Sequence, residues 1–277
     1  MGKYSVLMSL YIKEKPEYLD VSIKSMIEQT LKPDEIVIVK DGPITKELQD
    51  VLDKYIKEYP NLFNIVGYEE NKGLGYALNF GLKHCQNELV ARMDTDDISK
   101  LSRCEEQVNL FKKYPETDII GGDISEFIDF ENNIVSCRRV PKLDKEIKEY
   151  LKIRCPLNHV TVMFKKSSVI KSGGYIDLFW NEDYYLWIRM VEKNCKMANT
   201  GTILVNVRVG KDMYQRRGGK KYFESEKFLQ DYMLKNNLIK KYTYIKNIVL
   251  RFLIQILMPT KIRGWIFRIF AREKKND

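Results

Sequence analysis

The stretch that decides the fold is ELVARMDTDD, residues 88–97, in which a short apolar run leads directly into three carboxylates. Like charges packed this closely repel one another, so a folded chain rarely gathers them without a counter-charge. Two interpretations of this stretch alone remain open. Aspartate is common in turns at strand ends, which fits a solvated acidic turn. Carboxylate oxygens also suit a hard divalent cation such as Mn2+ or Mg2+, with phosphate oxygens completing its shell.

The chain upstream of this stretch repeats one pattern. Runs of apolar residues at 4–10, 35–40 and 63–68 read as buried strands, and they alternate with segments whose apolar residues recur at helical spacing. Strands that alternate with helices in this way indicate an α/β fold. We therefore expect a Rossmann-like, doubly wound, mainly parallel sheet.

The carboxyl ends of these strands carry polar residues. In a doubly wound sheet, ligands bind at that edge. Four segments should meet there: Leu10-Tyr11, Asp41-Gly42, Asn71-Lys72-Gly73 and Asp94-Thr95-Asp96. Each segment alone has an explanation as turn chemistry, and their joint placement is what favours a ligand site.

The middle of the chain continues with shorter elements. Residues 181–190 open a helix with Glu182 and Asp183 at its positive end. The other expected elements are helices over 102–114, 143–151 and 222–234, and strands over 118–128, 134–140, 158–164, 196–198 and 204–208.

Composition sets the class of protein. The chain has 277 residues, of which 44% are hydrophobic and 31% charged, as in a globular protein. Five dispersed cysteines form no CxxC pair, so neither a zinc site nor a disulfide framework is expected, and a reducing cytoplasm fits. The N-terminal segment lacks the long apolar core of a signal peptide.

The net charge of +9 is concentrated in the last segment. Residues 240–277 carry ten Lys and Arg against two acids, so the remaining body is nearly neutral and a nucleic-acid-binding face is not expected. The apolar residues of 248–258 and 265–270 are interrupted by arginines and are too short to span a membrane. They suit helices that lie on an anionic membrane surface. The alternative is a helical appendage packed on the body or on a second subunit.

Six motifs occur in an order that matches a known family. They are VLMSLY at 6–11, IVIVKDG at 36–42, NKGLGYALN at 71–79, ARMDTDD at 91–97, GGY at 173–175 and EDYYLW at 182–187. This ordered set resembles the family 2 inverting glycosyltransferases with a GT-A fold, especially bacterial capsule and exopolysaccharide transferases. The resemblance covers about residues 4–218.

Two departures from the family pattern matter. Lys40 replaces the first of two acids that usually end the second strand, which leaves Asp41 as the carried-over contact to the nucleotide base. The Gln-x-x-Arg-Trp motif of processive synthases is absent, and residues 214–218 read YQRRG instead. The transfer of one sugar per encounter is therefore expected, not processive polymerisation.

The resemblance implies a nucleotide-sugar donor, most commonly a UDP-sugar. A divalent metal, Mn2+ or Mg2+, would bind Asp96 with Asp94, while Asp97 would orient the turn and Arg92 would pair with the acids. Asp41 would accept from the N3–H of uracil; helix capping is the alternative. Lys72 would lie near the phosphates; a solvated loop lysine is the alternative. The donor-binding residues implied are Leu10, Tyr11, Glu14, Asp41, Asn71, Lys72, Gly73, Asp94, Thr95 and Asp96.

The resemblance also assigns the acceptor side. Asp183 matches the general base that takes the proton of the acceptor hydroxyl. Glu182, Trp180 and His159 are expected beside it. The alternatives are that both acids only complement a helix N-terminus, that the aromatic residues belong to the core, and that His159 is a core histidine with its hydrogen bonds satisfied.

The expected organisation is a glycosyltransferase domain over 1–218, with a nucleotide-binding half (about 1–100) and an acceptor half (about 101–218). A basic helical membrane-associating region would follow over 219–277. The enzyme would extend a lipid-linked oligosaccharide in capsule or exopolysaccharide synthesis, as a peripheral protein at the cytoplasmic face of the plasma membrane. A sugar nucleotidyltransferase is disfavoured because residues 10–14 (LYIKE) replace its glycine-rich phosphate loop. A non-catalytic scaffold is disfavoured by the intact acids Asp94, Asp96 and Asp183.

Overall fold

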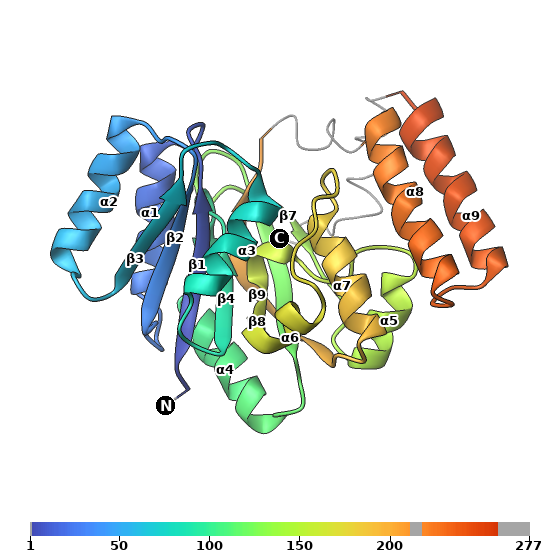
Figure 1. Ribbon diagram of the computed structural model, residues 1–277, viewed down its shortest axis with the longest axis horizontal. Coiled ribbons are helices and arrows are strands. Elements are labelled where there is room, and N and C mark those ends of the chain that lie inside the picture. The colour runs from blue at the N-terminus through green and yellow to red at the C-terminus, as the bar shows by residue number, and fades with distance from the viewer. Residues whose placement is uncertain (1, 211–217, 260–277) are drawn as a thin grey trace.

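The first half of the sheet consists of four parallel strands in the order β3-β2-β1-β4. They are β1 (Tyr4–Leu10), β2 (Glu35–Asp41), β3 (Phe63–Tyr68) and β4 (Leu89–Met93). Helices α1 (Pro16–Ile27), α2 (Lys46–Glu58) and α3 (Leu74–His84) connect them. This computed structural model describes residues 2–210 and 218–259 of the chain (Figure 1). The parallel α/β arrangement predicted for this half is confirmed.

The second half of the sheet is mixed, which corrects the prediction of a mainly parallel sheet. The order continues β4-β8-β6-β9-β5, and β7 pairs with β6. In this half β6 and β9 are parallel, whereas the other pairs are antiparallel. These strands are β5 (Ile98–Ser99), β6 (Ile119–Phe127), β7 (Ile134–Arg138), β8 (Met163–Lys165) and β9 (Met197–Arg208).

Three local predictions in this half were wrong. The two short strands expected over 196–208 form the single strand β9, because Gly201 adopts a left-handed φ of 78° at a register shift instead of ending the strand. The strand expected over 158–164 is a 3-10 turn (His159–Thr161) followed by the short strand β8. The short helix α6 (Lys166–Lys171) was missed.

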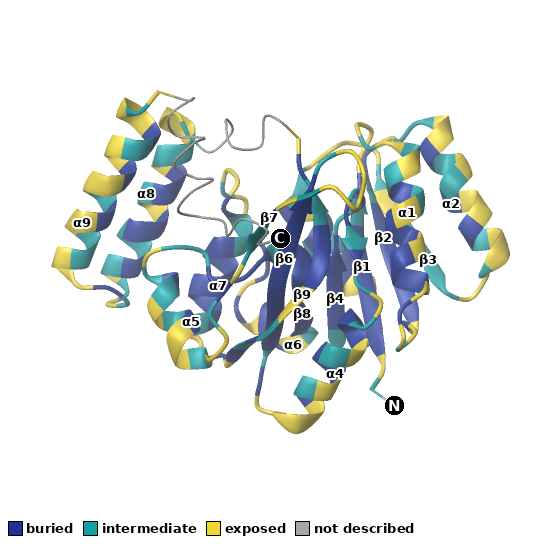
Figure 2. Cartoon of the chain, turned by 180° about the vertical axis from the view of Figure 1, so that it is seen from behind, coloured by how far each residue is buried: buried dark blue, intermediate teal, exposed yellow. Residues whose placement is uncertain are grey.

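Side chains alternate across the sheet and so build two cores, one on each face. The central strands are accordingly coloured as buried in Figure 2. In β1, Val6, Met8 and Leu10 pack with α1, α2 and α4 (Arg103–Lys113). Leu7, on the opposite face, packs with α3 and with α7 (Glu182–Glu192). Near α7 lies α5 (Asp144–Leu151). The two layers of helices hold the sheet edge that carries the polar strand ends.

The last described elements are α8 (Lys220–Lys235), α9 (Lys241–Phe252) and a π-helical turn, Leu253–Leu257. Helices α8 and α9 lie side by side, and α8 adds Leu229 and Met233 to the same core as α7 (Figure 1). Across residues 2–210 and 218–259, no helix has the length and apolarity needed to cross a membrane. Residues 211–217, with most of the YQRRG stretch, and residues 260–277, with the tail aromatics at 265–270, lie outside the described residues.

Candidate active site

The acidic turn after β4 is held in place from three sides. Arg103 of α4 is fully buried and donates to the Arg92 carbonyl at 2.6 Å, which fixes the end of the strand. The Ser22 hydroxyl of α1 donates to the Asp94 carbonyl at 2.6 Å. The Asp97 carboxylate accepts from the Arg208 backbone N–H at 2.8 Å, which ties the turn to β9.

The predicted counter-charge is present. Arg92 is only 3% exposed and donates from both terminal nitrogens to the two carboxylate oxygens of Asp94. Arg92 does not offset all the negative charge near this turn, and burial and the charges of Asp94 and Glu14 raise the pKa of Asp96 to about 7. Burial and the neighbouring Asp96 also raise the pKa of Asp97 well above its usual value.

These carboxylates have the chemistry of a divalent-cation site. One oxygen from each of Asp94, Asp96 and Asp97 lies within 4.8 Å of the others. Carboxylate oxygens are hard ligands, and a cation would offset the negative charge that Arg92 leaves uncompensated. The predicted pair Asp94 and Asp96 therefore lies together, and the geometry adds Asp97, which the sequence had given only an orienting role.

A cavity of about 830 Å³ opens at the carboxyl ends of β1, β2 and β4. Most of the predicted donor residues line it: Tyr11, Glu14, Asp41, Asn71, Gly73, Asp94, Thr95 and Asp96. Two do not. Leu10 belongs to the buried core beneath the cavity. The Lys72 ammonium lies over the Tyr76 ring, 4.9 Å from its centroid, and that side chain is not among those lining the cavity.

Asp41 organises the loop between β3 and α3. Its carboxylate accepts from the Tyr68 hydroxyl, the Asn71 amide and the backbone N–H groups of Lys72 and Gly73, at 2.7–3.0 Å. Gly42 makes this loop possible, because a Cβ on it would lie 2.7 Å from the Asn71 backbone nitrogen. A nucleotide base that bonds to Asp41 would have to share acceptor sites that the loop already uses.

Several residues that line this cavity were missed from the sequence. The most prominent is Arg208, whose Nε donates to the Asp96 carbonyl at 3.2 Å and whose guanidinium lies 3.8 Å from the centroid of the Tyr18 ring. Arg208 ends a strand that the sequence did predict, so the strand-end rule applied to β9 would have found it. Also missed were Ser9, Lys13, Lys15, Tyr18, Leu74, Asp129, Val209 and Gly210.

A second cavity, of about 590 Å³, lies between α7 and α9. Asp94 lines both cavities, so they meet at the acidic turn. The predicted residues Asp183, Trp180 and His159 line this second cavity, whereas Glu182 does not. Part of the wall comes from Leu250, Arg251, Ile254 and Gln255, which follow Asp183 by more than sixty residues.

Asp183 and Glu182 occupy the first turn of α7 and differ in their surroundings. The Cys155 thiol lies 3.7 Å from Asp183 Oδ2 and donates to it. Burial raises the pKa of the Asp183 carboxyl. Burial and the charge of Asp183 raise the pKa of Glu182 to about 7. Of these two acids, Asp183 lines the cavity and so presents its carboxylate there, whereas Glu182 does not.

The neighbours of Asp183 have distinct roles. His159 Nε2 lies 3.0 Å from the Tyr175 hydroxyl, and burial and the Arg92 charge hold its pKa well below the usual value, so it is neutral. Trp180 is 48% exposed, adopts a left-handed φ of 56° and stacks on Phe179 with a centroid separation of 4.7 Å. A bulky side chain in that backbone region is strained.

The glycine turn at 173–174 serves packing. A Cβ on Gly174 would lie 2.5 Å from the Asn79 side-chain oxygen, so this glycine permits close approach to α3. Paired glycines can also permit close backbone approach to a ligand. Neither of them is among the residues that line the two cavities.

Comparison with curated proteins finds close relatives. The chain is 37% identical, over 98% of its length and 97% of the relative's, to the Escherichia coli UDP-Gal:alpha-D-GlcNAc-diphosphoundecaprenol beta-1,3-galactosyltransferase. It is 39% identical, over 95% of its length and 97% of the relative's, to the amylovoran biosynthesis glycosyltransferase AmsE of Erwinia amylovora.

Two solved structures share the fold. S. aureus TarS 1-349, determined with UDP-GlcNAc, matches with a TM-score of 0.68 and 14% identity, over 95% of this chain and 78% of that one. The mannosyltransferase PcManGT of Pyrobaculum calidifontis, determined with GDP-Man and Mn2+, matches with a TM-score of 0.62 and 15% identity, over 97% of this chain and 75% of that one.

These likenesses confirm the GT-A fold expected from the sequence motifs. The model of the family described as glycosyl transferase family 2 matches residues 5–172, which is more than half of the chain. The chain therefore belongs to glycosyl transferase family 2 and is a glycosyltransferase.

Proposed function

We propose that the protein transfers one sugar, with inversion, from a UDP-sugar to a lipid-linked saccharide in capsule or exopolysaccharide synthesis. The observation that carries this proposal is the meeting of the two cavities at Asp94. A donor in the first cavity and an acceptor in the second would face each other across the acidic turn.

The donor would lie in the cavity at the ends of β1, β2 and β4. Asp41 and the loop that it organises would contact the nucleoside, while Thr95, Glu14 and Arg208 would lie nearer the diphosphate. The name of the 37% identical relative includes UDP-Gal. The fold neighbours were determined with both uridine and guanosine donors, so the fold alone does not select the base.

Asp96, Asp94 and Asp97 would hold Mn2+ or Mg2+. When bound, the metal neutralises charge on the diphosphate leaving group. Because Arg92 already engages both oxygens of Asp94 and the Arg208 N–H engages Asp97, Asp96 would be the principal ligand. Arg92 itself would stay with Asp94 and set the resting charge of the turn.

Asp183 would act as general base. The acceptor hydroxyl oxygen attacks C1 of the donor sugar, the bond from C1 to the phosphate oxygen breaks, and its electron pair leaves with UDP. The hydroxyl proton passes to Asp183, and the new glycosidic bond forms on the face opposite the leaving group. The Cys155 thiol holds one Asp183 oxygen and leaves the other for the proton. Trp180 would stack on the acceptor sugar.

The lipid-linked acceptor is supported by the relative's name, which includes diphosphoundecaprenol. The C-terminal helices would place the enzyme on an anionic membrane. Along α9 and the following turn, Ile245, Val249, Leu253 and Leu257 are exposed at a spacing of four residues, which forms one apolar stripe. Basic residues of the tail would attract anionic lipid.

Calorimetric titration with UDP, GDP and dTDP, each with and without Mn2+, tests the donor site. Of the three nucleotides, we expect only UDP to bind tightly, and to do so only in the presence of Mn2+. Asp96→Asn should abolish the Mn2+ dependence, whereas Asp50→Asn, on the exposed side of α2, should bind as the parent protein does. Absence of nucleotide binding under every condition would overturn the donor site, and preference for GDP would overturn the choice of base.

A further inference from the structure

Arg154 lines the second cavity and differs from the other arginines there in the described part of the chain. Its Nη2 atom is buried and has no hydrogen-bond partner within residues 2–210 and 218–259. A buried donor without a partner is costly and therefore calls for an explanation.

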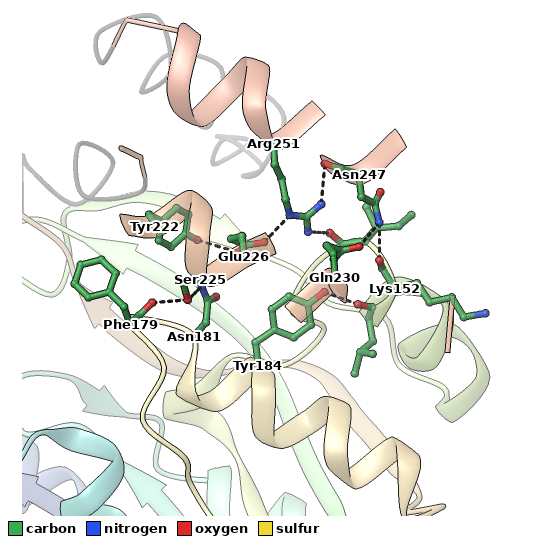
Figure 3. A network of polar contacts seen from close by, with 12 residues as sticks. Lys152, Phe179, Asn181, Tyr184, Tyr222, Ser225, Glu226, Gln230, Asn247 and Arg251 are labelled. Carbon is green, nitrogen blue, oxygen red and sulfur yellow. Dashed lines mark hydrogen bonds and ion pairs between the residues drawn. The ribbon is translucent and has the colours of Figure 1, made fainter. Parts of the chain in front are cut away.

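The other arginines of this cavity are engaged. Arg92 pairs with Asp94. Arg138 donates to the Asn158 side-chain oxygen at 2.7 Å and to the Cys155 carbonyl at 2.6 Å. Arg251 donates to Glu226 Oε2 at 2.6 Å, as part of the network that joins α8 and α9 to the body (Figure 3).

The residues on either side of Arg154, Ile153 and Cys155, also line this cavity. Cys155 follows Arg154 and contacts Asp183, and the side chains of Arg154 and Asp183 line the same cavity. Ile153 precedes it, is 54% exposed and accepts from Arg251 Nη2 at 2.6 Å through its carbonyl. With Leu250 and Ile254, Ile153 forms an apolar lip on the same cavity. A carboxylate, a guanidinium and an apolar lip thus line one cavity.

We infer that Arg154 binds the phosphate that joins the acceptor sugar to its lipid, and that the lip of Ile153, Leu250 and Ile254 holds the first part of the hydrocarbon. This inference rests on the proposed function. These three parts of the cavity suit an amphiphile with its sugar hydroxyl at Asp183, its phosphate at Arg154 and its chain leaving over α9. Leu250 lines the cavity and is also 46% exposed, so the lip continues toward the apolar stripe of α9.

Farnesyl diphosphate and farnesol are suitable probes, because they share the phosphate and the isoprenoid chain without specifying a sugar. Binding is measured calorimetrically in EDTA, so that no metal-dependent donor site contributes. We expect Arg154→Gln to weaken the binding of farnesyl diphosphate on the order of ten- to a hundredfold, the effect of losing one charge-assisted pair. Arg154→Lys should lose less, and the affinity for farnesol should not change.

Lys152→Gln is the matched control. Lys152 lies two residues away and pairs with Glu149 at 2.6 Å, outside the cavity. The Lys152→Gln variant should bind farnesyl diphosphate as the parent protein does. Equal affinity of the parent protein and Arg154→Gln would overturn the inference, as would complete displacement of farnesyl diphosphate by UDP.

A UDP titration of the same proteins in Mn2+ separates this inference from the function that it rests on. If UDP binds normally but the parent protein and Arg154→Gln bind farnesyl diphosphate equally well, only the phosphate site is overturned. Loss of UDP binding in the parent protein overturns the donor site instead.

Discussion

The buried guanidinium of Arg92 donates to both carboxylate oxygens of Asp94, which lies two residues further along the chain. The buried guanidinium therefore compensates one acid of the turn, and the cation proposed for this site would compensate the others. Such a division would explain how three acids fold together on one turn.

Replacing Arg92 with Met should lower the free energy of unfolding by about 3 kcal/mol, because Asp94 is left without its counter-charge beside two further acids. Urea denaturation measures the loss. The double variant Arg92→Met/Asp94→Asn should recover most of it, and Mn2+ should stabilise the single variant more than the parent protein. A loss that Asp94→Asn does not relieve would show that Arg92 acts through packing instead.

Asp183→Asn should reduce sugar transfer by a factor on the order of 10²–10⁴, the contribution of a positioned general base. UDP binding should not change, because Asp183 lines only the second cavity. Glu182→Gln is the matched variant one residue away, and it should retain most activity. Equal losses in the two variants would contradict the assignment of the base to Asp183 alone.

Glu182 should make stability depend on pH. Its pKa is about 7 in the folded protein against 4.5 as the usual value, so the folded state holds its proton more firmly than the unfolded state does. The contribution of this group to the free energy of unfolding is therefore largest below about pH 4.5 and is lost as the pH rises to about 7. Glu182→Gln should remove this loss. The unfolding free energy of the variant minus that of the parent protein should therefore be about 1–3 kcal/mol larger at pH 8 than at pH 4. A pH-independent difference between the variant and the parent protein would contradict this.

Trp180→Gly should separate stability from acceptor binding. Glycine relieves the left-handed backbone at φ 56°, which offsets the lost stacking on Phe179, so the unfolding free energy should change by less than about 1 kcal/mol. The KM for the acceptor should rise about tenfold, while the KM for the donor stays the same. Trp180→Phe keeps an aromatic ring and should retain most of the affinity. A large loss of stability would instead place Trp180 among the structural residues.

The sequence predicted the first half of the fold well because its signals there are local. Uninterrupted apolar runs mark the buried strands, and the residues after each run lie at the ligand edge. At two positions the predicted residue does not line the cavity: Leu10 still points into the core, and the Lys72 side chain turns onto Tyr76. Neither position differs in sequence pattern from the neighbours that do line it.

The second cavity could not be predicted in the same way, because distant segments close it. Asn247 donates to the Lys152 carbonyl and Arg251 to the Ile153 carbonyl, contacts that join residues 95 and 98 positions apart. No periodicity records such a contact. Arg154 therefore reads as an ordinary surface arginine until α9 is placed over it. The sequence shows the basic charge of this region, but it does not show that Arg251 pairs with Glu226 inside the protein.

The wall that α9 contributes has a consequence for how such enzymes diversify. The first cavity is built largely from the first hundred residues, whereas α9 and the turn Leu253–Leu257 contribute one wall of the second cavity. Under the proposed function, substitutions in α9 and this turn would re-target the enzyme to a new acceptor while the donor residues stay as they are. A library confined to Leu250, Ile254 and Gln255 would exploit this separation, and evolution could make a new polysaccharide linkage by the same route.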